Sequence, residues 1–124
     1  MARARIDDIA GRDAVAEWVR EGDGTARPVL ALAVRYTLQL LAELSPGGTV
    51  EVRVPPFGAV QCIEGPRHTR GTPPNVVETD ASTWLGLATG RASWGEARGS
   101  GRVHASGQRA DLEGHVPVIG DPAR

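Results

Sequence analysis

The sequence has one cysteine, no lysine and few aromatic residues: three Trp, one Tyr and one Phe. A single cysteine excludes an internal disulfide, and it fits a reducing cytoplasm. The longest apolar run, residues 29–34, is far shorter than the ~20 residues of a membrane-spanning helix. We therefore expect no stable membrane insertion. Because no charged and then apolar leader opens the chain, we expect a cytoplasmic protein.

The chain also lacks the signatures of nucleic-acid and cofactor binding. A net charge of −1 gives no general attraction to nucleic acid. No Gly-Lys-Ser/Thr phosphate loop occurs, and the glycines of 99–101 run into a predicted strand, unlike a dinucleotide fingerprint. The histidines and the cysteine do not have metal-ligand spacing. We therefore expect no cofactor and no metal.

A length of 124 residues predicts one domain, 1–124, with its core at about 7–112 and loose ends on both sides. Asp7 or Asp8 is expected to cap a first helix that runs to about Glu21. Pro28 suits the first turn of a second helix, which we expect to be central and to pack against a sheet. Its apolar face is Leu30, Val34, Leu41 and Leu44 with Leu38 nearby, and its polar stripe is Arg35, Gln39 and Glu43.

Strict alternation at residues 50–54 predicts a strand with one buried face, and the breaker at residues 55–58 predicts a turn into a second strand, 59–63. With Pro56 at the centre of the turn, Val52 opposes Val60 and Val50 opposes Cys62. All four side chains then share the inner face. A slip of one residue would place Val52 against a polar residue and mix the two faces, so we predict the first register.

The second half of the chain predicts two further strands and two short helices. Residues 75–79 read as a third strand, after which Asp80 caps a helix that ends at Gly90. Ser93 has capping-box spacing to Glu96, so another helical turn follows. A fourth strand is expected at 102–105, a short helix or helical turn at 108–112, and a packed or paired segment at 116–119.

Three segments resemble the small bacterial relatives of the sterol carrier proteins: TVEVRVPPFGAVQCIEGPRHTRGTPPNVVETD at 49–80, TWLGLATGRASW at 83–94 and GRVHASGQRADL at 101–112. The resemblance implies an α/β (α+β) fold in which a sheet of about five strands carries helices on one face. It also implies an apolar cavity between the layers. Members of this family bind or carry sterols and other lipid-like molecules without performing chemistry.

The resulting functional expectation is a non-enzymatic carrier of a hydrophobic small molecule, with an acidic head group as one option. Seven apolar side chains are the candidate cavity lining: Leu30, Val34, Leu38, Val52, Val60, Trp84 and Leu87. Arg67, His68 and Arg70 lie in a Gly/Pro-rich loop, where arginine forks can bind a carboxylate or phosphate head group. The competing interpretation of that loop is a solvated surface whose arginines pair with nearby carboxylates.

Two other functions stay open. A thiol-dependent isomerase-type or accessory domain, related to maleylpyruvate isomerase, would use the same Arg/His loop. Cys62 beside His68 would then be nucleophile and base, although the strand pattern places Cys62 on the inner face, where a thiol is usually inert. The third function is a protein-interaction module whose cavity is filled by its own side chains.

Overall fold

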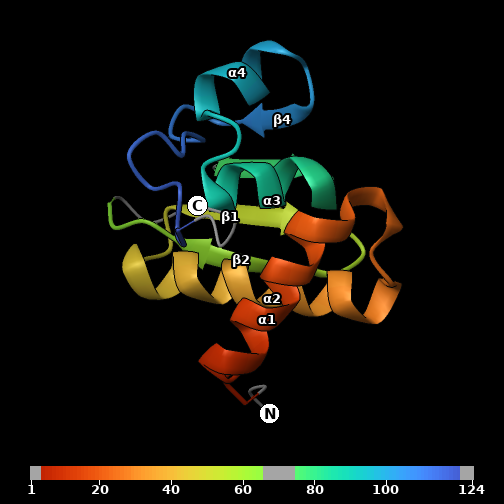
Figure 1. Cartoon of the computed structure of the whole chain (residues 1–124). Coiled ribbons are helices and arrows are strands. Elements are labelled where there is room, and N and C mark those ends of the chain that lie inside the picture. The colour runs from red at the N-terminus through yellow and green to blue at the C-terminus, as the bar shows by residue number, and fades with distance from the viewer. Residues whose placement is uncertain (1–3, 66–74, 121–124) are drawn as a thin grey trace.

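The four-stranded sheet is mixed, with strand order β2-β1-β3-β4. We describe a computed structural model, which covers residues 4–65 and 75–120 (Figure 1). Strand β1 pairs antiparallel with β2 and parallel with β3, and β3 pairs antiparallel with β4. The elements are α1 (Asp8–Glu21), η1 (Gly22–Gly24), α2 (Arg27–Leu44), β1 (Val50–Val54), β2 (Gly58–Cys62), β3 (Asn75–Thr79), α3 (Ala81–Thr89), α4 (Trp94–Gly99) and β4 (Val103–Ser106).

The predicted hairpin register is confirmed. Val52 pairs with Val60, and Val50 pairs with Cys62. Through β3 and β4 the same row continues on the inner face as Val77 and Ala105. The opposite face carries the row Ala59, Arg53, Glu78 and His104, so the alternation of the sequence separates an apolar face from a polar one.

The predicted helix caps are also confirmed. The Asp7 carboxylate accepts hydrogen bonds from the backbone N–H groups of the first turn of α1. Asp80 caps α3, which ends at Gly90 in the left-handed conformation, φ 80°. Ser93 and Glu96 form the reciprocal capping box of α4. Such caps satisfy backbone N–H groups that lack an intrahelical partner, so they fix where each helix begins.

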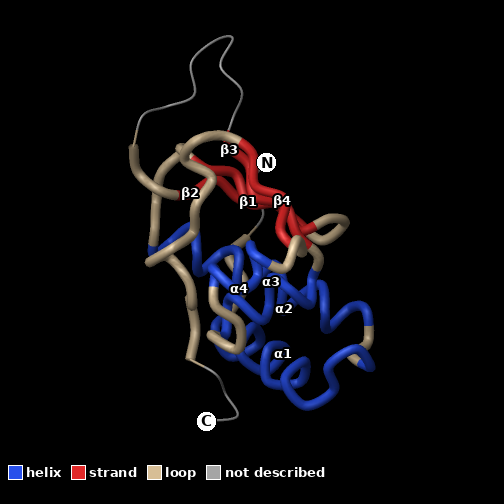
Figure 2. Tube along the Cα trace, turned by 90° about the horizontal axis from the view of Figure 1, so that it is seen from above, coloured by secondary structure: helices blue, strands red, loops and turns tan. Residues whose placement is uncertain are grey.

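All helices lie on one face of the sheet, as expected (Figure 2). Helix α2 is central, because it contacts α1, α3 and β2. Buried Thr37 on α2 accepts a hydrogen bond from Trp84 Nε1 on α3 at 2.8 Å, which satisfies the indole inside the core. The predicted position of α2 against the sheet is confirmed.

Two expectations about the fold were wrong. Among residues 4–65 and 75–120 the sheet has four strands, not about five. The apolar segment at 116–119 does not extend the sheet, because the backbone N–H groups of Val118 and Ile119 both donate to Ala88 O at the end of α3. Leu44 was expected on the buried face, but it is 65% exposed. It is the last residue of α2, and it lies at the rim of a surface hollow with Leu40 and Ile119.

Candidate ligand-binding groove

Five of the seven predicted lining residues are fully buried, and two, Leu30 and Val60, are partly exposed. Four of them have an exposed fraction of zero: Val34, Val52, Trp84 and Leu87. An atom without accessible surface has no water-sized space beside it, so these four form packed core in this conformation. Leu38 is 1% exposed, while Leu30 and Val60 are partly buried and pack against the core.

Leu38 and Val60 meet at a groove of about 610 Å³ between α2, the β1–β2 hairpin and the N-terminal residues 4–6. We call it the α2–β2 groove, and we call residues 4–6 the strap. Apolar lining comes from α2 and the hairpin: Leu38, Ala42, Phe57, Ala59 and Val60. Polar lining comes from Arg5, Arg35, Gln39 and Glu43. The structure thus brings two predicted residues together at an amphipathic site on the edge strand β2.

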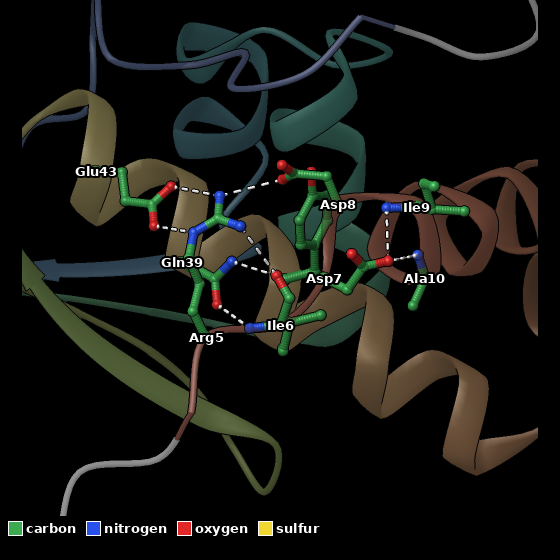
Figure 3. Close-up of polar contacts among 9 residues, drawn as sticks. Arg5, Ile6, Asp7, Asp8, Ile9, Ala10, Gln39 and Glu43 are labelled. Atoms are coloured by element: carbon green, nitrogen blue, oxygen red, sulfur yellow. Dashed lines mark hydrogen bonds and ion pairs between the residues drawn. The ribbon is translucent and has the colours of Figure 1, made fainter.

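Hydrogen bonds and an ion pair from α2 side chains hold the strap against α2 (Figure 3). Arg5 makes a forked contact with Glu43, with Nε–Oε2 2.6 Å and Nη2–Oε1 2.9 Å. Gln39 binds both backbone groups of Ile6, because its amide oxygen accepts from the N–H at 2.8 Å and its amide nitrogen donates to the carbonyl at 3.0 Å. The strap is therefore one wall of the groove, held by the polar stripe of α2.

A second set of contacts extends this network onto α1. Tyr36 OH donates to Asp8 Oδ1 at 2.8 Å, and Arg5 Nη2 lies 3.1 Å from the same oxygen. The hydrogen bond from Tyr36, with that from Arg5, lowers the pKa of Asp8. The hydrogen bond from Arg5 lowers the pKa of Glu43, and burial, with the bond to Asp8, raises the pKa of Tyr36. Both carboxyls are consequently ionised at neutral pH.

The opposite wall is the hairpin turn. Arg35 Nε donates to Phe57 O at 2.8 Å, and the Arg27 guanidinium stacks 5.2 Å above the Phe57 ring. A Cβ placed on Gly58 would lie 3.6 Å from Leu38 Cδ1 and 3.7 Å from Arg35 Cγ. An added carbon would therefore be in ordinary van der Waals contact with both side chains, so α2 packs against the start of β2.

The sequence did not identify the polar stripe Arg35, Gln39 and Glu43 as part of a site. Its spacing of four residues marks one continuous line on a helix, and that line was recognised only as a polar face. The residues that bind it, in the strap and the hairpin turn, lie 22 to 38 positions away along the chain. The predicted head-group residues Arg67, His68 and Arg70 lie outside the described residues.

Two side chains that could act as nucleophiles, Cys62 and Ser45, have a structural role in this fold. Cys62 is fully buried, and burial raises its pKa to about 11 from 9.0, so it is a neutral thiol at physiological pH. Ser45 Oγ lies 2.8 Å from His115 Nδ1, and Ser45 O accepts from Ile63 N. These contacts tie the end of α2 to the C-terminal segment and to the end of β2.

Among the described residues no three His, Cys, Asp or Glu side chains form a possible metal site.

The fold and groove define a small α+β domain with one helix-covered sheet face and an amphipathic groove at the sheet edge. The chain belongs to the family described as bacterial SCP ortholog, whose model matches residues 26–118. This agrees with the resemblance found in the sequence, and it indicates a carrier domain. No curated protein matches the chain. In the part of the chain that the structure describes, no helix combines the length and apolar character needed to cross a bilayer.

Proposed function

We propose that the chain is a non-enzymatic carrier domain that binds a hydrophobic, lipid- or sterol-like small molecule in the α2–β2 groove. The observation that supports this proposal is the groove itself, with Leu38 and Val60 among its lining. Its volume of about 610 Å³ falls within the range of about 300–1,000 Å³ typical of small-molecule sites, as does that of the hollow beside Leu44, but the groove, unlike that hollow, includes two of the predicted lining residues. The family match covers α2 and the hairpin, which supply most of the lining.

Binding would be driven by removal of apolar surface from water. Each methylene that enters the groove contributes ~0.8 kcal/mol, or about a fourfold gain in affinity, until the groove is full. A deeper cavity between α2, α3 and the sheet stays a prediction. Its lining would be the remaining candidates: Leu30, Val34, Val52, Trp84 and Leu87. Such a cavity requires α2 or α3 to move away from the sheet when the ligand enters.

The test is an NMR titration of the protein with decanol and with shorter alcohols. We expect amide shift changes at residues 38 and 57–60, and an affinity that rises with chain length. Val60→Phe fills the groove and should weaken binding at least tenfold. Val76→Phe makes the same change on the opposite face of the sheet, so it should leave binding unchanged. The absence of binding by any alcohol, or equal weakening by both variants, would refute the groove as the site.

The second part of the proposal is that Arg67, His68 and Arg70 bind the head group of the ligand. It rests on the composition of that loop. The double variant Arg67→Ala, Arg70→Ala tests it by titration with an acidic ligand. Unchanged affinity would remove the loop from the site.

The closed interior favours one alternative, a protein-interaction module whose cavity is filled by its own side chains. Four of the seven predicted lining residues are completely enclosed, which is the packing that this alternative requires. Native mass spectrometry of the protein purified from its host distinguishes the two. A lipid that co-purifies supports the carrier, whereas a ligand-free protein that also binds no alcohol supports the interaction module. Turnover with a thiol cofactor would instead support the isomerase-type function.

A further inference from the structure

Of the two arginines that line the α2–β2 groove, one has acidic partners and the other has none among the described residues. Arg5 is neutralised by Glu43 and Asp8, and Gln39 is occupied by the backbone of Ile6. Arg35 also lines the groove, but its Nε donates to a neutral carbonyl, Phe57 O. Arg35 forms no ion pair with any described residue, so among the charged side chains that line the groove it is the one without a charged partner there.

Arg35 is also held in a fixed position. The Nε–H bond to Phe57 O, at 2.8 Å, holds the guanidinium at the hairpin turn. Because Nε is occupied, the two terminal nitrogens remain as a pair of parallel donors. Such a pair matches the two oxygens of a carboxylate. The side chain is partly buried, where an ionic contact is stronger than in bulk water.

We infer that Arg35 binds the head group of a single-chain carboxylate whose alkyl chain lies along Leu38 and Val60. This inference rests on the proposed function and specifies the ligand of the same groove. Glu43 lies eight residues further along α2, about 12 Å by helical rise, so the groove has a free cation at one end and a paired acid at the other. The carboxylate is thereby directed to the Arg35 end.

Among the described residues that line the groove, one guanidinium has no charged partner, and it balances the single charge of a carboxylate, whereas a phosphate monoester carries about 1.5 to 2 at neutral pH. Arg27, stacked on Phe57 beside the lining, is a second cation at the same turn, so decyl phosphate is the ligand that distinguishes the two head groups. A neutral alcohol, in contrast, leaves the desolvated guanidinium without an ionic partner.

The test compares decanoate, decanol and decyl phosphate in NMR titrations near pH 7 with the wild type, Arg35→Gln and Arg53→Gln. Arg53 is the matched control, because it lies on the opposite sheet face and is paired with Glu51. We expect the wild type and Arg53→Gln to bind decanoate about tenfold to a hundredfold more tightly than decanol. Arg35→Gln should lose that preference, so that decanoate binds no more tightly than decanol, and Arg35→Lys should retain part of it.

Several outcomes would overturn the inference. These are equal wild-type affinity for decanoate and decanol, an unchanged preference in Arg35→Gln, or decyl phosphate binding as tightly as decanoate. Loss of the preference in Arg67→Ala, Arg70→Ala while Arg35→Gln keeps it would assign the head group to the loop instead. Decanol binding in each variant shows that the groove is intact. If neither decanol nor decanoate binds the wild type, the proposed function fails, which is a separate result.

Discussion

Gly11 offers a direct test of how α1 is seated on α2. It is buried, and a Cβ at this position would lie less than 3.0 Å from three atoms of the Tyr36 ring, Cγ, Cδ1 and Cδ2. Carbon atoms in good contact are about 3.5–4.0 Å apart. The Tyr36 ring is itself fully buried, and its hydroxyl is bound to Asp8. The ring therefore cannot turn aside without breaking that bond or separating the helices.

The change in the free energy of unfolding caused by Gly11→Ala is the sum of two opposing effects. Alanine in a helix interior is more stable than glycine by roughly 0.5–1 kcal/mol. Overpacking a closed core costs about 1–3 kcal/mol, and an overlap with the face of a rigid ring belongs at the upper end. We expect a net loss of about 1–2 kcal/mol in the free energy of unfolding, a sign opposite to that of an ordinary helical Gly→Ala change.

The assay is urea unfolding monitored by tryptophan fluorescence, with Gly95→Ala as the matched control. Gly95 is on α4, and a Cβ there would have no atom within 4 Å. The control should raise stability by up to ~1 kcal/mol. If Gly11→Ala raised stability as well, the contact between Gly11 and Tyr36 would not be as close as the structure shows, and the seating of α1 on α2 would need revision.

Three other predictions concern single interactions. Thr37→Val should lower the free energy of unfolding by about 1–3 kcal/mol because the buried Trp84 Nε1 is left unsatisfied. Trp84→Phe loses the same hydrogen bond and buried ring volume, but the Thr37 hydroxyl still donates to Ala33 O; a double variant as costly as the two losses added together would contradict a shared hydrogen bond. The lowered pKa values of Asp8 and Glu43 mean that their contribution is complete above their ordinary values of 3.8 and 4.5 and is lost as pH falls. The protection factors of the strap amides, which compare the measured exchange rate with the intrinsic rate at the same pH, should therefore fall in acid. Protection factors that do not change with pH would count against the ion pairs. Cys62, with a pKa of about 11, should react with iodoacetamide near pH 8 far more slowly than free cysteine, and at the same rate in urea; faster reaction in the native state would revive the thiol-enzyme alternative.

Local chemistry in the sequence was enough to predict most elements of the fold. The alternation of Val50, Val52 and Val54 determined the buried face of β1, and the hairpin register followed because a one-residue slip exposes that face. Asp7, Asp80 and Ser93 marked helix starts, since each can accept hydrogen bonds from unpaired N–H groups in the first turn. These features depend on residues a few positions apart.

The groove could not be predicted in the same way. Which apolar residues border a groove depends on three-dimensional packing: Val34 and Leu38 are both fully buried, yet Leu38 borders the groove and Val34 does not. The strap wall depends on Gln39 binding Ile6 and on Arg5 binding Glu43, across 33 and 38 positions of sequence. Polar contacts of that range leave no periodic signal along the chain.

The two walls of the groove are held by different kinds of contact, and this has a consequence for ligand exchange. The hairpin wall is part of the sheet, and the family match includes it. The strap wall precedes the matched residues, and its ion pairs are about half exposed, at Arg5, Asp8 and Glu43, while Gln39 holds Ile6 through two part-buried hydrogen bonds. Exposed ion pairs are weak and are screened by salt. Opening of the groove should therefore proceed by release of the strap, while the hairpin and Arg35 keep their positions on the sheet side.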